Sequence, residues 1–75
     1  MSELSVNSEA SGSVWKIEVV IGQQVAEGDT LLVIESMKME LPLAAPSAGT
    51  VAQILVAEGE MVEEDQPLLL LTARS

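Results

Sequence analysis

The feature that most constrains the fold of this chain is an internal repeat with a period of 37 residues. When residues 2–36 are aligned with residues 39–73 without a gap, 11 of the 35 pairs are identical, whereas ordinary composition would give about two. The identical pairs are Glu3/Glu40, Leu4/Leu41, Gly12/Gly49, Val14/Val51, Ile17/Ile54, Val19/Val56, Gly22/Gly59, Val25/Val62, Glu27/Glu64, Leu31/Leu68 and Leu32/Leu69. The 75-residue chain is therefore expected to be a single domain, residues 1–75, made of two copies of one structural unit.

Each copy is predicted to consist of β-strands. Residues 13–20 and 50–56 are rich in β-branched and apolar side chains, and no stretch has the 3.6-residue apolar period of a helix. The expected strands are residues 3–6, 13–20, a very short strand at Val25 and 31–35 in the first copy, and residues 40–43, 50–56, a very short strand at Val62 and 67–72 in the second.

Two local features recur in both copies. The apolar residues of the long strand are spaced by three and then by two positions, which breaks strict alternation and predicts a bulge at the same place in each copy. Gly28 is aligned with Asp65, and both residue types tolerate the left-handed backbone region, so a positive φ is predicted at both positions. One copy alone would expose its strand edges and its apolar face, so the two copies must pack around an approximate two-fold axis. The predicted fold is therefore all-β, a flattened barrel or sandwich of about eight strands.

Composition and charge exclude several functions. Twelve acidic residues against three basic ones give a net charge of −9, which repels nucleic acids and anionic membrane surfaces and favours partners with basic faces. The chain has no cysteine and no histidine, so neither a metal site nor a histidine-based catalytic set is expected. No signal peptide and no membrane-spanning run is recognisable in the sequence. A cytoplasmic protein is expected, or a mitochondrial one if the domain is excised from a larger protein.

The two copies meet at the hexapeptide Glu35-Ser36-Met37-Lys38-Met39-Glu40. Lys38 is the middle residue of the chain and one of only two lysines. The flanking strands leave two or three residues between them, which is the length of a tight hairpin. Because a shift of 37 residues relates Lys38 to Met1 and to Ser75, the hairpin tip is expected at the end of the domain opposite to both termini.

The hexapeptide, together with Ala45-Pro46-Ser47-Ala48-Gly49-Thr50-Val51 after it, resembles the biotinyl (biotin carboxyl carrier) domain family over about residues 12–72. This resemblance implies a barrel–sandwich hybrid of two four-stranded antiparallel sheets, with the lysine on a hairpin turn. It implies biotin attached covalently to Lys38 by a biotin–protein ligase. It also implies that the domain carries a carboxyl group between a biotin carboxylase and a carboxyltransferase, with an acyl-CoA carboxylase as the expected enzyme.

The resemblance also assigns roles to the neighbours of Lys38. Met37 and Met39 are expected to offer partners an adaptable apolar surface, and Glu35 and Glu40 complete the expected cofactor-binding site. No residue of the domain is expected to be catalytic, so the ligase has to supply the base that deprotonates the lysine amine.

The sequence departs from the family pattern at Ser36, where alanine is most often found, and it leaves no room for the thumb insertion of some bacterial carrier proteins. Three other interpretations of Lys38 stay open. It can be an ordinary turn lysine, or the lysine of a lipoyl domain, which shares the fold but usually has an acidic residue before the lysine. It can also lie on an unmodified structural or docking module. Trp15 is interpreted as a partly exposed strand residue or as core filler rather than as a docking contact, because no other aromatic residue accompanies it.

Overall fold

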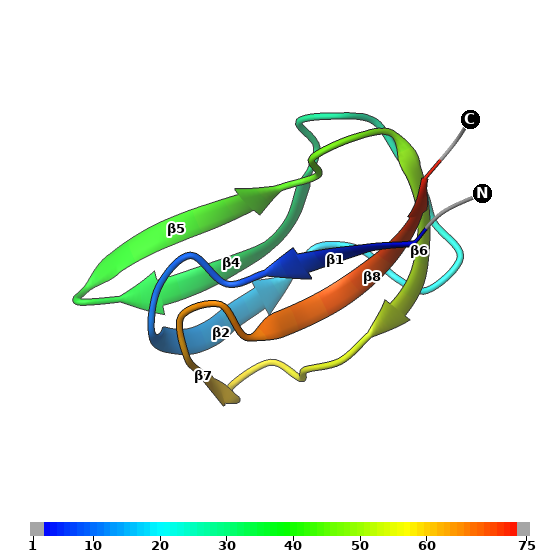
Figure 1. Ribbon diagram of the computed structural model, residues 1–75. Coiled ribbons are helices and arrows are strands. Elements are labelled where there is room, and N and C mark those ends of the chain that lie inside the picture. The colour runs from blue at the N-terminus through cyan, green and yellow to red at the C-terminus, as the bar shows by residue number, and fades with distance from the viewer. Residues whose placement is uncertain (1–2, 74–75) are drawn as a thin grey trace.

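The computed structural model of the protein describes residues 3–73, and this range contains eight strands and no helix. The strands are β1 (Glu3–Asn7), β2 (Gly12–Ile17), β3 (Gln24–Val25), β4 (Thr30–Ser36), β5 (Met39–Ala44), β6 (Gly49–Ile54), β7 (Met61–Val62) and β8 (Pro67–Ala73). Figure 1 shows an elongated body, with Cα extents of 37 × 17 × 17 Å. Nothing in the described range could cross a membrane as a helix.

The strands form two four-stranded sheets in which all neighbouring strands are antiparallel. The hairpin sheet has the order β5-β4-β2-β7, and the terminal sheet has the order β1-β8-β6-β3. Each sheet takes two strands from the first copy and two from the second, so neither copy has a complete sheet of its own. This interleaving explains why both copies are needed for one core, and it confirms the predicted all-β fold of two four-stranded sheets.

Equivalent residues of the two copies pair in equivalent registers. Glu3 pairs with Thr72 in the terminal sheet, and their mates 37 residues away along the chain, Glu40 and Glu35, pair with each other in the hairpin sheet. The same relation holds along the whole length of both pairs of strands. The structure therefore has an approximate two-fold symmetry. A residue of one sheet can be compared with the equivalent residue, 37 positions away, in the other sheet.

The predicted bulges are present in both long strands. The register of β2 against β4 shifts between Val14 and Lys16, and the register of β6 against β8 shifts between the equivalent residues, Val51 and Gln53. Both strands end earlier than predicted. β2 ends at Ile17 rather than at residue 20. Glu18 N still donates a hydrogen bond of 2.9 Å to Leu31 O, and the chain leaves the sheet after it. β6 likewise ends at residue 54 rather than 56.

The core lies between the two sheets and is entirely aliphatic. Of the seven apolar pairs that are identical in both copies, five are buried in both: Val14/Val51, Val19/Val56, Val25/Val62, Leu31/Leu68 and Leu32/Leu69. Burying one such side chain stabilises the fold by about 1.5–3 kcal/mol. The repeated residues are therefore the ones that hold the sheets together.

The turns carry the backbone conformations that the sequence predicts. Gly28 has a φ of 91° and Asp65 has a φ of 68°, so the positive φ expected at both positions is confirmed. In the first of these turns Asp29 Oδ2 accepts a hydrogen bond from Ala26 N at 2.9 Å. These short, hydrogen-bonded turns keep the connections close to the sheets and leave the β4–β5 hairpin as the part that projects furthest (Figure 1).

Candidate functional site

The β4–β5 hairpin closes through a turn of two residues, Met37 and Lys38, because β4 continues through Ser36 and β5 begins at Met39. The φ angles are 51° at Met37 and 65° at Lys38. Two consecutive positive φ values define a type I′ turn, which matches the twist of the flanking strands but normally uses asparagine and glycine. Each residue other than glycine destabilises the fold by roughly 1–2 kcal/mol when its backbone is in this left-handed region. The turn is therefore less stable with Met37 and Lys38 than it would be with asparagine and glycine.

The three residues at the tip are exposed. Met37 is 91% exposed and Met39 is 61% exposed, and Lys38 lies between them with an exposed side chain. Among residues 3–73 the ion pair that forms joins the other lysine, Lys16, to Glu18 at 3.8 Å. The amine of Lys38 is therefore open to a reagent or an enzyme, flanked by two flexible apolar side chains.

The hairpin tip lies at one end of the long axis of the molecule. Figure 1 shows the start of β1 and the end of β8 together at the opposite end, consistent with the pairing of Glu3 with Thr72. Met1 and Ser75, to which the sequence prediction refers, lie outside the described residues. The described ends of the chain, β1 and β8, therefore lie at the end of the molecule away from Lys38.

Two carboxylates face each other one step behind the tip. Glu35 on β4 is paired directly with Glu40 on β5, and both side chains are exposed. Like charges directly opposite each other destabilise a strand pair. In the terminal sheet the equivalent pair is Glu3 with Thr72, which has no such repulsion. The hairpin sheet therefore carries an unfavourable acidic pair beside the lysine that the other sheet lacks.

Contacts from another loop position the tip, and the sequence prediction missed them. Ser36 Oγ donates a hydrogen bond of 2.7 Å to the backbone oxygen of Ser11, in the β1–β2 connection. Gly12 lies so close to β4 that a Cβ atom there would come within 2.3 Å of Glu35 O. The repeated Gly12/Gly49 identity was a signal of this close approach, whereas nothing in the sequence indicated the Ser36–Ser11 bond.

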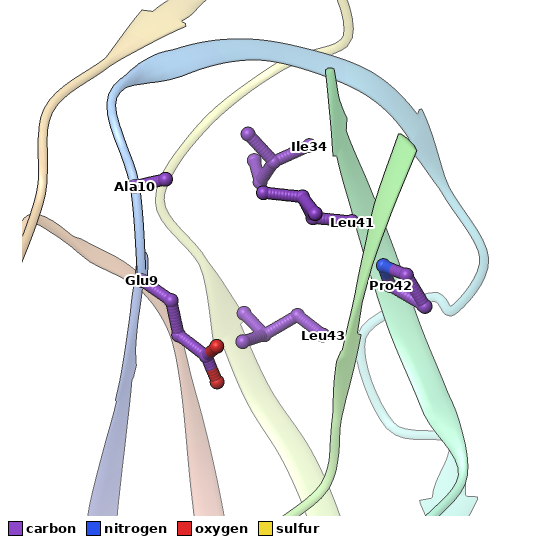
Figure 2. A pocket seen from close by; sticks show the side chains of 6 residues that line it. All are labelled: Glu9, Ala10, Ile34, Leu41, Pro42 and Leu43. Carbon is purple, nitrogen blue, oxygen red and sulfur yellow. The ribbon is translucent and has the colours of Figure 1, made fainter. Parts of the chain in front are cut away.

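A hollow lies between the β1–β2 connection and the hairpin (Figure 2). Its cavity volume is about 10 Å³, which is room for about one water molecule, so it does not hold a cofactor ring. Its lining residues are Glu9, Ala10, Ile34, Leu41, Pro42 and Leu43. Within residues 3–73 no set of three or more His, Cys, Asp or Glu side chains is arranged to hold a metal ion. What the described residues offer at this end of the molecule is therefore an exposed amine.

Known proteins are similar to this chain in sequence and in fold. The family model described as biotin-requiring enzyme, which covers biotin and lipoyl attachment domains, matches residues 1–71. The biotin/lipoyl attachment protein of Bacillus subtilis is 36% identical over 69 residues, which is 92% of this chain and 94% of that protein. The biotin carboxyl carrier protein of acetyl-CoA carboxylase from Pseudomonas aeruginosa is 45% identical over 53 residues, 71% of this chain and 34% of that protein.

The fold is also found inside much larger enzymes. A solved single-chain, multi-domain long-chain acyl-CoA carboxylase superimposes with a TM-score of 0.91 at 33% sequence identity, covering 96% of this chain and 7% of the enzyme. The chain thus spans nearly all of the small attachment protein, about a third of the carrier protein and a small part of the multi-domain carboxylase. On the strength of the family model and these relatives, the chain belongs to the biotin/lipoyl attachment family.

Proposed function

We propose that the chain is a single carrier domain, residues 1–75, made of two repeats (2–36 and 39–73), and that biotin is attached covalently to Lys38. The observation that carries this proposal is the exposed lysine on a two-residue turn, between two exposed methionines, at the far end of the body. Family membership adds the expectation of a covalently bound cofactor. The domain itself is not an enzyme: it is the substrate of a biotin–protein ligase.

The attachment step needs only an accessible amine from this chain. Lys38 would hold biotin through an amide bond between its Nζ atom and the carboxyl carbon of biotin. The ligase would supply the activated carboxyl group with its leaving group, and also the base that takes the surplus proton from Nζ. Lysine suits this role because its long stem carries a compact amine, whereas the guanidinium of arginine stays protonated.

The hairpin then serves as a fixed mount for a flexible arm. When bound, biotin supplies a ureido ring that accepts and releases a carboxyl group. The chain contributes its position: tethering converts delivery into a local encounter at an effective concentration on the order of millimolar. Met37 and Met39 offer each partner enzyme a deformable apolar contact, and Glu35 and Glu40 lie beside them as acidic contacts.

The partners we propose are the biotin–protein ligase, a biotin carboxylase and a carboxyltransferase, and the enzyme we favour is an acyl-CoA carboxylase. The support comes from relatives named as the biotin carboxyl carrier protein of acetyl-CoA carboxylase and from the superposition on an acyl-CoA carboxylase. A lipoyl carrier is the second candidate, because the family model covers both attachments. The methionines on both sides of Lys38 favour biotin.

The test is the intact mass of the chain after co-expression with a biotin–protein ligase in medium containing biotin. We expect one biotinyl group per chain, and none on the Lys38→Arg variant, which should keep the thermal midpoint of the wild type because the side chain is exposed. One lipoyl group would identify the second candidate. A bare wild-type chain would reject the carrier function, and a biotinylated Lys38→Arg variant would reject Lys38 as the attachment residue.

A further inference from the structure

The outer face of the hairpin sheet, the side turned away from the core, holds an exposed tryptophan. Trp15 lies in β2 and is 49% exposed, so it is the partly exposed strand residue of the sequence interpretation and not core filler. It is the extra residue in the β2 bulge, between Val14 paired with Ile34 and Lys16 paired with Val33. Val14 and Ile34 belong to the core cluster, and side chains alternate between the two faces of a strand. Val33 therefore lies on the outer face, Lys16 lies there as its direct partner across the two strands, and the bulge adds the exposed Trp15 to the same face.

Val33 shows what these side chains do. It is only 8% exposed, yet it is not a member of the contiguous core cluster, so it is covered from outside the sheet. Figure 2 shows Leu41 and Leu43 pointing toward the Glu9–Ala10 segment and Pro42 pointing to the opposite side of β5. Pro42 is paired with Val33. On the outer face Val33 is therefore flanked by Pro42 on β5 and by the bulge of β2, which holds its partner Lys16 and the neighbouring Trp15.

Met61 extends this apolar surface to the edge strand. It is 73% exposed and is paired with Ser13, next to the bulge of β2. Its neighbour Val62 is 2% exposed and lies in the core, so Met61 points outward with Trp15. The apolar docking face is accordingly defined by Trp15, Val33, Pro42 and Met61.

The terminal sheet provides an internal control for this face. The positions equivalent to the four residues, 37 residues away along the chain, hold Ala52, Leu70, Ser5 and Gln24. Three apolar side chains are thus replaced by small or polar ones. Leu70 is more exposed than Val33 although it is larger, because no tryptophan or proline flanks it. Packing within the fold does not require the apolar residues, since the same backbone forms without them in the other sheet.

The charges around the face select the kind of molecule that covers it. Lys16 is already paired with Glu18 at 3.8 Å, whereas the opposed carboxylates of Glu35 and Glu40 lie on the same outer face, toward the tip, by strand alternation. A second copy of this chain is a poor partner for this face, because it would bring its own acidic residues against Glu35 and Glu40. Each copy also carries a net charge of −9, so the two copies repel each other. A partner with an apolar pocket rimmed by lysine or arginine would relieve the repulsion between the two carboxylates.

We propose that this face is the surface by which the biotin–protein ligase binds the domain, with Trp15 as the apolar anchor; the inference rests on the carrier function proposed above. The ligase meets a chain that carries no cofactor, and it must select Lys38 over Lys16. That selection has to come from the protein surface. Enzymes that act later can recognise the attached group itself, so they depend less on this face.

The geometry allows one interface to cover both the anchor and the lysine. Trp15 is level with residues 33–34 of β4, four to five residues from Lys38, which corresponds to about 15 Å at 3.3 Å per residue. A standard interface buries about 800 Å² on each partner, equivalent to a disc with a radius of roughly 16 Å. A ligase whose active site holds Lys38 therefore reaches Trp15 without a second contact region.

The test measures biotinylation rates at varied concentrations of the full chain, using a purified biotin–protein ligase, biotin, ATP and Mg²⁺, with intact mass as the readout. We expect Trp15→Ala to raise KM about ten- to thirty-fold, as loss of a tryptophan anchor does, with kcat changed less than about two-fold because the contact is the same in ground and transition states. Trp15→Leu, which keeps a cover over Val33, should fall between. Leu55→Ala is the matched control: Leu55 is 46% exposed, follows β6 of the other sheet, and should leave KM unchanged.

The outcomes separate this inference from the carrier function. If the wild type gains a biotinyl group and Trp15→Ala has the same KM, the docking face is refuted while the carrier function stands. A KM that rises equally for Leu55→Ala would refute it as well. A concentration-dependent dimer of the wild type that Trp15→Ala abolishes would assign the face to self-association instead. A wild type that gains no mass would reject the carrier function itself.

Discussion

Replacing Gly12 by alanine should distort the lysine hairpin from outside it. An ideal Cβ at this position would lie 2.3 Å from Glu35 O and 3.0 Å from Ile34 Cγ2. Backbone atoms cannot yield as a flexible side chain does, so β2 and the end of β4 must separate by several tenths of an ångström or more. Glu35 is three residues from Lys38, and the shift is therefore transmitted to the turn.

The expected size of the effect follows from the contact. Overpacking of this kind costs typically about 1–3 kcal/mol, and each kcal/mol lowers the thermal midpoint of a domain of 60–100 residues by about 4–8 °C. We therefore expect the thermal midpoint of Gly12→Ala, measured by circular dichroism, to lie at least about 4–8 °C below that of the wild type. A urea titration should show a free energy of unfolding that is lower by about 1–3 kcal/mol.

The repeat supplies a matched control. Gly49 occupies the equivalent position, and a Cβ there would lie 2.5 Å from Thr72 O, at the end of the molecule away from Lys38 (Figure 1). Gly49→Ala should be destabilised by a similar amount. Only Gly12→Ala should also slow biotinylation, measured at a temperature where both variants are fully folded.

Two results would contradict this reasoning. An unchanged midpoint for Gly12→Ala would mean that the close approach of β2 to β4 does not exist in solution. Equal rates of biotinylation for the two folded variants would mean that the position of β4 does not control how the turn is presented.

Two further predictions concern the hairpin itself. Ser36→Ala removes the hydrogen bond to Ser11 O and should lower the free energy of unfolding by about 0.5–1.5 kcal/mol; an unchanged urea midpoint would show that the bond contributes nothing. Met37→Asn places a residue that tolerates positive φ where φ is 51° and should raise the free energy of unfolding by up to about 1 kcal/mol, while removing an apolar contact raises KM for the ligase. A variant that is less stable than the wild type would contradict the type I′ assignment.

The repeat made most of the fold predictable. Identical apolar pairs such as Val14/Val51 and Leu31/Leu68 mark positions that face the core in both copies, because a two-fold body uses each position twice. The break in alternation predicted the bulge for the same reason. The strand ends were less predictable: Val19 is buried like a strand residue, although the chain has already left the ladder after Glu18, so an apolar run alone does not define where pairing stops.

The surroundings of the lysine could be predicted only in part. The two-residue turn and its exposed methionines follow from the local sequence and the strand lengths. The bond from Ser36 to Ser11 and the outer face around Trp15 do not, because they depend on segments that meet only in the folded protein. The bulge decides the side on which Trp15 lies, and a sequence with broken alternation is compatible with either side.

The central claim is that one amine, at the tip of the β4–β5 hairpin, receives biotin. Its most direct test is to digest the chain after reaction with biotin–protein ligase and to locate the added mass by fragmentation of the peptides. We predict a single biotinyl group on Lys38 and none on Lys16, whose side chain is also exposed. Biotin on Lys16, or on both lysines in similar amounts, would contradict the account, because the hairpin would then offer the ligase nothing that a strand lysine lacks.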